Sequence, residues 1–142
     1  MGYTHYWDAV RFTTTQFDTL KDLVSRMQDN CTTPIRVKFK FLDDGNEQIW
    51  IYGECEEFVL NKRYFEIRKY GDFCKTRRMP YDELVVATLI AASEINPNFK
   101  WGSDGNANDH IRGRRLHHVT TMTMNEKYIR FIANRKLALD KR

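Results

Sequence analysis

The apolar run from Leu84 to Ala92, which follows Pro80 closely, is the strongest constraint on how this chain folds. Its apolar residues occupy nearly every side of a helix instead of one stripe, which predicts a helix buried all round. Proline is favoured at the first helical position, and Asp82 and Glu83 suit the positive end of a helix dipole. The run is also much shorter than the roughly 20 residues that span a membrane. We therefore expect a central helix, ending near residues 96–97, in the core of a soluble protein.

A strict alternation of apolar and cationic residues predicts a half-buried strand over 35–41. The turn sequence at 43–46 and the apolar residues of 48–53 predict that this strand forms a hairpin. On the second arm, Ile49 and Ile51 would face one side of the sheet, and Trp50 and Tyr52 the other. The remaining predicted elements are a strand over 2–12, an amphipathic helix over 13–30 capped by threonine, one or two strands within 55–71, and a short strand over 99–101. Together they predict an α+β fold, with an antiparallel or mixed sheet and helices packed mainly on one face.

Positive charge is concentrated in the last quarter of the chain. Up to Asp104 there are 14 Lys and Arg against 16 Asp and Glu, and the totals of 23 and 19 leave 9 against 3 from Gly105 onward. We expect Asp109 to cap a short basic helix over 110–118, and a final basic amphipathic helix over 125–139. The 142 residues would then form one domain with a basic helical C-terminal segment, about 105–142. Contact of this segment with nucleic acid is one alternative, and a solvated helix face is the other.

Cysteine usage and the N-terminal residues indicate a cytoplasmic protein. Three widely spaced cysteines without a CxxC pair favour reduced thiols over a disulfide framework or a structural zinc site. The N-terminal residues lack the layout of a signal peptide. We expect no membrane association, no cofactor and no bound metal.

The cations directly ahead of the central helix form the main candidate site. A helix N-terminus attracts anions, because its first N–H groups are free and its dipole end is positive. Pro80 and the acidic first turn already specify the start of this helix, so the preceding cations are not needed for it. Lys75, Thr76, Arg77 and Arg78 are therefore predicted to bind phosphate. The alternative is an ordinary solvated loop.

A second polar loop, after the strand at 99–101, is expected to reach the same rim, because that strand returns along the central helix. Its residues Ser103, Asp104 and Asn106 would hydrogen-bond a sugar or a base. The aromatic residues Tyr3, Tyr6 and Trp7 would stack a base. Alternatively, the loop is only a connecting turn, and the aromatic residues are buried in the core or in a homodimer interface.

No set of residues predicts catalysis. The His117 to Thr120 segment contains one H-x-T triplet, but two-histidine phosphoesterases need two, and neither His5 nor His110 begins a second. Asp104, Asp109 and His110 match no known metal-ligand spacing. We therefore assign no catalytic residue and expect a binding protein rather than an enzyme. A phosphodiesterase or nuclease remains the alternative.

Three short blocks of this sequence resemble a family of small proteins of tailed phages, prophages and bacteria. They are GYTHYW at 2–7, FCKTRRMPYD at 73–82 and SDG at 103–105, whereas 106–142 has no counterpart. The resemblance implies a phage-type accessory protein in the cytoplasm of the host cell. Such proteins often act against host defence, and one strategy is to bind and hide a nucleotide second messenger.

The residues and the resemblance together predict that this chain sequesters a small phosphate-bearing nucleotide. A cyclic oligonucleotide or an ADP-ribose-derived signal is the expected class, and a homodimer is the expected assembly. The alternatives are an enzyme that cleaves such a ligand, or a module that binds a host protein or nucleic acid.

Overall fold

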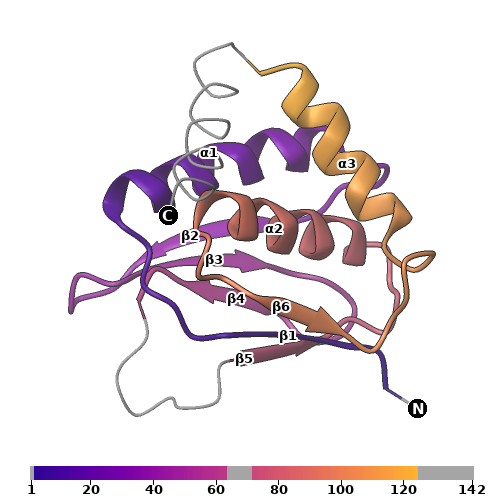
Figure 1. The fold of residues 1–142 in the computed structure, drawn as a ribbon, viewed down its shortest axis with the longest axis horizontal. Helices are drawn as coiled ribbons and strands as arrows, with labels where there is room; N and C mark the ends of the chain where they lie inside the picture. The colour runs from indigo at the N-terminus through magenta and orange to yellow at the C-terminus, as the bar shows by residue number, and fades with distance from the viewer. Residues whose placement is uncertain (1, 64–71, 125–142) are drawn as a thin grey trace.

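The computed structural model describes residues 2–63 and 72–124 of the 142-residue chain. Within these residues there are three helices and two antiparallel three-stranded sheets, with the helices on one side of the strands (Figure 1). The predicted α+β fold is confirmed. The elements are β1 (Thr4–Trp7), α1 (Thr14–Asp29), β2 (Val37–Phe41), β3 (Glu47–Ile51), β4 (Phe58–Asn61), β5 (Asp72–Lys75), α2 (Asp82–Ile95), β6 (Trp101–Ser103) and α3 (Ile111–Met122).

The strands form two sheets, where the sequence predicted one. Their orders are β5–β1–β6 and β2–β3–β4, so the N-terminal strand lies between two strands that come much later in the chain. Tyr6 is paired with Phe73 on one side and with Gly102 on the other. The N–H of Glu56 donates to the carbonyl of Lys75 at 3.1 Å, which joins the two sheets locally without a continuous ladder.

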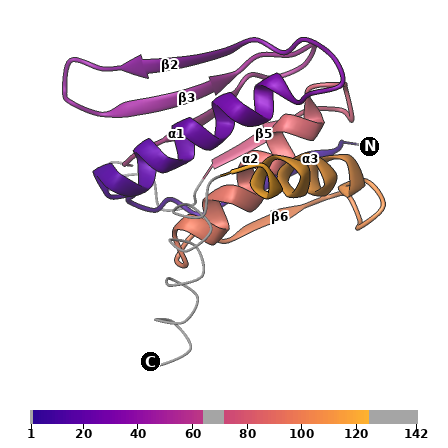
Figure 2. The same cartoon turned by 90° about the horizontal axis from the view of Figure 1, so that it is seen from above.

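Helix α1 lies over the β2–β3–β4 sheet and α2 lies beside β6, whereas α3 packs against α2 (Figure 2). Thr13 and Gln16 form a reciprocal capping box at the start of α1, which satisfies two otherwise free N–H groups. Phe17, Leu20 and Met27 have no exposed surface, as their helical spacing predicted. The hairpin prediction is also confirmed, since β2 pairs antiparallel with β3, and Ile49 and Ile51 are fully buried. The predicted half-burial of the first arm is wrong toward its end, because Phe39 and Phe41 are 40% and 76% exposed.

Helix α2 is the centre of the core. The side chains of Leu84, Val85, Val86 and Leu89 have no exposed surface, so the helix is buried on nearly all sides as predicted. It begins at Asp82, with Tyr81 as the N-cap residue, two positions later than Pro80. None of the described helices is long and apolar enough to pass through a membrane.

Helix α3 begins differently from the prediction. Its N-cap residue is His110, which makes no side-chain capping bond. Asp109 instead accepts hydrogen bonds from the Arg78 side chain and from the N–H of Asn106. The prediction that Asp109 caps this helix is therefore wrong. Gly113 lets α3 approach α2 closely, since a Cβ there would overlap the Val86 side chain. The predicted helix over 125–139 lies outside the described residues.

Candidate functional site

Three distant segments meet at the N-terminal end of α2. Strand β1 lies between β5 and β6, so the loop from β5 to α2 and the loop from β6 to α3 emerge on either side of it (Figure 1). The second loop packs tightly on β1, because a Cβ on Gly105 would overlap the Tyr3 ring. The three blocks of the sequence resemblance are therefore neighbours in space, as the prediction of a shared rim required.

Asp82, in the first turn of α2, is at the centre of a buried polar cluster. Tyr3 donates its hydroxyl to Oδ2 at 3.1 Å, and Thr76 donates its hydroxyl to Oδ1 at 2.6 Å. His5 places Nε2 at 2.6 Å from Oδ1, where a carboxylate requires an N–H donor. Burial, followed by the charge of Asp82, raises the pKa of Tyr3, so this phenol stays protonated as a donor. The cluster ties β1 and the β5–α2 loop to the start of α2.

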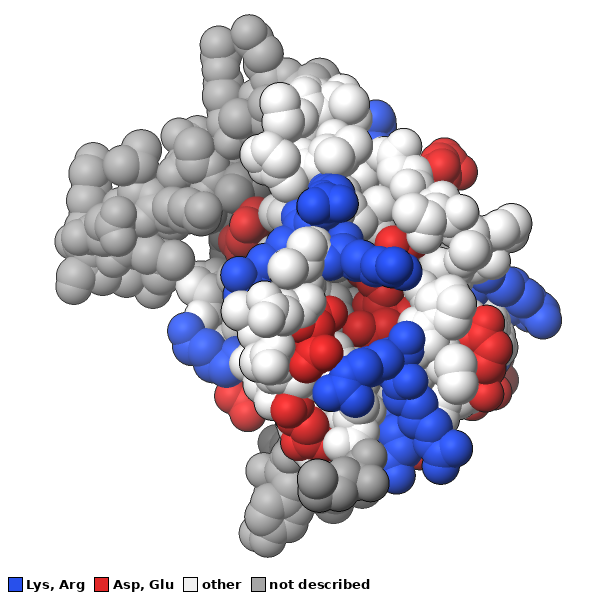
Figure 3. All heavy atoms as spheres, turned by 90° about the vertical axis from the view of Figure 1, so that its right-hand side faces the viewer, with Lys and Arg blue, Asp and Glu red and all other residues white. Residues whose placement is uncertain are grey.

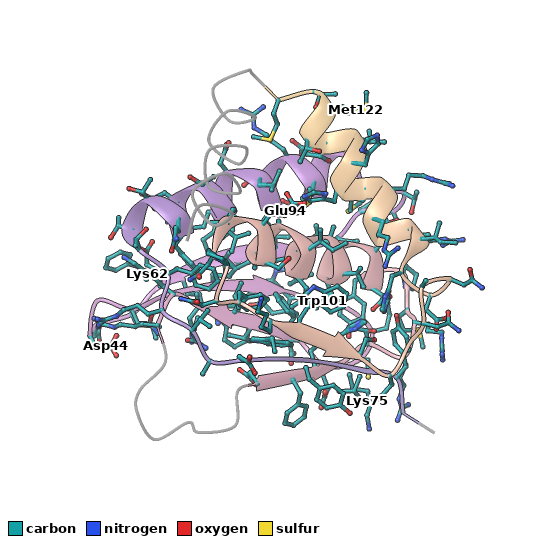
Figure 4. All side chains as sticks on the ribbon, in the orientation of Figure 1. Asp44, Lys62, Lys75, Glu94, Trp101 and Met122 are labelled. Atoms are coloured by element: carbon teal, nitrogen blue, oxygen red, sulfur yellow. The ribbon has the colours of Figure 1, made fainter. Side chains whose placement is uncertain are left out.

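A second histidine lies beside His5. The rings of His5 and His110 are 5.8 Å apart, and Trp101 packs on His110 at 5.3 Å, between β6 and α2 (Figure 4). Nδ1 of His5 and Nε2 of His110 are buried and have no hydrogen-bond partner among the described residues. Burial, followed by the charge of His5, lowers the pKa of His110. Because His5 has no exposed surface, its pairing with Asp82 orders the site and does not present a base to solvent.

The β5–α2 loop holds two arginines in an unusual backbone conformation. Arg77 and Arg78 have φ of 52° and 57°, the left-handed region that ordinary residues avoid. This conformation costs roughly 1–2 kcal/mol per residue for a side chain with a Cβ. The Arg78 guanidinium lies 4.3 Å from the centre of the Tyr3 ring and donates to Asp109 Oδ1 at 2.9 Å. Strained backbone of this kind concentrates at functional sites.

A cleft of about 340 Å³ opens where Arg78 faces α3. Asp82 and Glu83 lie at its floor, and Arg78, Asn108, Asp109 and Arg112 lie around it. Seen from this side, acidic side chains lie in a hollow and basic side chains surround it (Figure 3).

The carboxylates of the cleft already have partners. Asp82 accepts the hydrogen bonds of its buried cluster, and Glu83 Oε1 accepts from both the N–H and the hydroxyl of Thr32, at 2.8 and 3.0 Å. The hydrogen bond from Arg78 holds the pKa of Asp109 below its ordinary value. Arg112 is exposed and lines the cleft. The cleft thus offers guanidinium groups at its rim and hydrogen-bond acceptors at its floor, which suits a ligand with an anionic group and hydroxyls.

The residues predicted to bind phosphate separate into two groups. Arg78 lines the cleft, and Thr76, which is fully buried, supports its floor through Asp82. Lys75 shares the outward face of its sheet with Phe73, on the side away from the helices (Figure 4). Arg77 is exposed and does not line the cleft.

The predicted base-stacking aromatics are not arranged around the cleft. Trp7 is 3% exposed and packs against Phe58 at 5.0 Å, so the prediction that it stacks a base is wrong for this structure: the core covers its ring. Tyr6 is exposed on the outward face, where it donates to Asp104 Oδ2 at 3.4 Å. Tyr3 is buried beneath Arg78.

The three polar residues of the second loop shape its turn. Ser103 Oγ accepts from the N–H of Gly105, and Asn106 Oδ1 accepts from the N–H groups of Asn108 and Asp109. Asp104 donates its backbone N–H to the carbonyl of Thr4. A ligand contact by any of the three stays a prediction.

Sequence reasoning missed several residues of the site. Asp82 and Glu83 were interpreted only as favourable charges for a helix dipole, and Arg112 only as part of a basic tail. His5 was dismissed because it begins no second triplet. The available signal was the period-2 alternation of residues 3–7, which puts Tyr3, His5 and Trp7 on one face. No group of three or more His, Cys, Asp or Glu among the described residues could hold a metal ion.

Comparison of the chain with models of protein families, with curated proteins and with solved structures finds no match.

Proposed function

We propose that the cleft at the N-terminal end of α2 binds a small phosphate-bearing nucleotide and holds it without cleaving it. The observation that carries this proposal is the strained pair Arg77–Arg78, which directs a guanidinium to the rim of the cleft. Arg77 and Arg78 are the central residues of a turn that the N–H of Met79 closes on the carbonyl of Thr76 at 3.0 Å. Turns with two positive φ values usually hold Gly, Asn or Asp, so two arginines here are consistent with a requirement to position Arg78.

Phosphate would bind between Arg78 and Arg112. Arginine makes paired hydrogen bonds to phosphate oxygens, and the N-terminal end of a helix adds the favourable end of its dipole. Arg78 is 59% exposed at its side chain, so it can turn from Asp109 to a ligand with little desolvation.

Ribose hydroxyls would face the floor. Glu83 accepts through Oε1 from Thr32, and the ribose hydroxyls would donate to its second oxygen, Oε2. Asn108, at the rim, adds a carboxamide. A volume of about 340 Å³ lies at the lower end of the roughly 300–1,000 Å³ typical of ligand pockets. It therefore suits one phosphate and its sugar, not a complete cyclic oligonucleotide.

Binding is favoured over cleavage by the positions of the histidines. His117, the first residue of the H-x-T triplet, is largely buried and lies 3.4 Å from Glu94 of α2. His5 is enclosed beneath the site. Neither histidine lines the cleft. In the phage setting that the sequence resemblance implies, holding a nucleotide signal would counteract a host defence.

Isothermal titration calorimetry tests the proposal. The panel contains the four ribonucleoside 5′-monophosphates, ADP-ribose and cyclic dinucleotides. Arg78→Ala should weaken the best ligand about 10- to 100-fold, the equivalent of about 1.5–3 kcal/mol for a hydrogen bond to a charged group. Lys75→Ala, which removes a nearby cation on the opposite side of the sheet, should change affinity less than twofold.

Three results would contradict the proposal. Wild-type protein that binds no member of the panel would refute the binding function. An equal loss with Lys75→Ala would place the ligand outside the cleft. Recovery of cleaved ligand after the protein is denatured would replace sequestration by hydrolysis.

A further inference from the structure

We infer, on the basis of the proposed function, that the base of the nucleotide lies in a second recess between α3 and the segment after α1. This recess has a volume of about 400 Å³ and is lined by Asn30, Thr32, Leu116 and Val119 together with Arg112 and Arg115. The ligand class that follows is a nucleotide bound by both its phosphate and its base.

The two recesses are adjacent. Glu83 and Arg112 line both of them, so the floor carboxylate and one rim guanidinium form their common boundary. Neither recess alone is large, but a ligand that passes over Glu83 occupies both. The glycosidic bond of a nucleotide would cross this boundary, with ribose on one side and base on the other.

The second recess has the chemistry that a base requires. Leu116 forms an apolar wall at 6% exposure, and Val119, one turn further along α3, is 46% exposed. An apolar side chain so exposed beside a recess provides a surface for a flat ring. Arg112 and Arg115 border the same recess, and planar guanidinium groups stack well on aromatic rings.

Asn30 can read the edge of the base. Its Nδ2 donates to Thr120 Oγ1 at 3.0 Å, which orients the carboxamide and directs the remaining acceptor, Oδ1, elsewhere. An oriented amide oxygen accepts from the exocyclic amino group of adenine, cytosine or guanine. Thr32 has no free donor for the base, because its N–H and its hydroxyl both donate to Glu83.

The aromatic residues in and directly before β1 offer no competing base site from the cleft. Arg78 covers the Tyr3 ring, the core covers Trp7, and Tyr6 lies on the outward face of its sheet. A ligand whose phosphate contacts Arg78 and Arg112 therefore meets α3 and not β1.

Calorimetry with a matched pair of probes tests the inference. The first probe is the ribonucleoside 5′-monophosphate that binds most tightly, and the second is ribose 5-phosphate, which lacks only the base. Val119→Asp places a carboxylate in the second recess at a position that is exposed and therefore tolerant of it. Met122→Asp, at 68% exposure on the same helix and outside both recesses, is the control.

We expect Val119→Asp to weaken the monophosphate at least tenfold and ribose 5-phosphate less than twofold, and Met122→Asp to weaken neither. The inference would be overturned if Val119→Asp left the affinity for the monophosphate unchanged. It would also be overturned if Val119→Asp lowered the affinities for the monophosphate and for ribose 5-phosphate by the same factor. A wild-type affinity for the monophosphate no higher than that for ribose 5-phosphate would overturn it as well. In those cases the phosphate site of the proposed function stands. Only a wild-type protein that binds neither probe, and nothing else in the panel, refutes both.

Discussion

Asp82→Asn should lower the free energy of unfolding by about 3 kcal/mol. The carboxylate accepts three hydrogen bonds from buried donors, namely the hydroxyls of Tyr3 and Thr76 and Nε2 of His5. A hydrogen bond to a charged group is worth about 1.5–3 kcal/mol, and a neutral one about 0.5–1.5. Asparagine has the same shape and leaves no cavity. Its Oδ1 can still accept from Thr76 and His5, at a loss of about 1 kcal/mol of charge assistance per bond. Its Nδ2 cannot accept, so the Tyr3 hydroxyl must turn to accept from it, which replaces a charged bond by a neutral one at a similar cost of about 1 kcal/mol. A loss of this size is a large fraction of the stability of a small domain.

Urea unfolding, followed by both circular dichroism and tryptophan fluorescence, measures this loss. Asp22→Asn is the control, since Asp22 is 56% exposed at its side chain and pairs with Arg26 at the surface of α1. Exposed ion pairs contribute roughly 0–1 kcal/mol, so the control should move the midpoint little. Tyr3→Phe removes only the bond to Oδ2 and should cost less than Asp82→Asn. Because the two changes share one hydrogen bond, the double variant should lose less than the sum.

The reasoning fails in two circumstances. If Asp82→Asn costs less than about 1 kcal/mol, the buried cluster does not stabilise the fold as its geometry implies. If Tyr3→Phe and Asp82→Asn are strictly additive, the two side chains do not interact in solution.

Three further predictions follow from single positions. The free energy of unfolding should fall as the pH decreases below about 6.5, the ordinary pKa of a histidine in an unfolded chain. Burial lowers the pKa of His110 in the folded protein, so below this pH the unfolded chain binds a proton that the folded protein does not. His110→Gln should reduce this dependence, measured as Tm against pH, whereas an equal reduction in exposed His118→Gln would contradict the assignment. Gly113→Ala should cost about 1–3 kcal/mol in urea unfolding, because the added methyl group separates α3 from α2; Gly102→Ala, which meets nothing within 4 Å, should be tolerated. Thr13→Ala should cost about 1 kcal/mol by loss of the α1 cap, and an unchanged midpoint would argue against that cap.

Local sequence signals determined most of the elements. The cap at Thr13 and the spacing of Phe17 and Leu20 specify α1 by contacts within a few residues, and the structure agrees with them. The same is true of the hairpin, where Ile49 and its neighbours alternate in and out. Asp109 shows the limit of such signals. It has the residue type of a helix cap, yet Arg78, 31 positions earlier, binds its side chain instead.

The location of the candidate cleft could be predicted from the sequence, but its lining residues could not. Cations before an apolar helix identified the loop that holds Arg78, since the helix N-terminus and its preceding residues are contiguous in the chain. The outward direction of Lys75 depends on the pairing of β5 with β1, a strand some 70 residues away. The same sheet buries Trp7 and exposes Tyr6.

The sequence by itself therefore determined the helices, the hairpin and the charged loop, because these depend on neighbours along the chain. The tertiary structure alone decided that Asp82 faces Tyr3 and His5, and that Glu83 and Arg112 border both recesses. The physical reason is that the alternation of a strand divides its side chains into two sets, but only packing decides which set is covered. Long-range pairing of β1 with β5 and β6 makes that choice here.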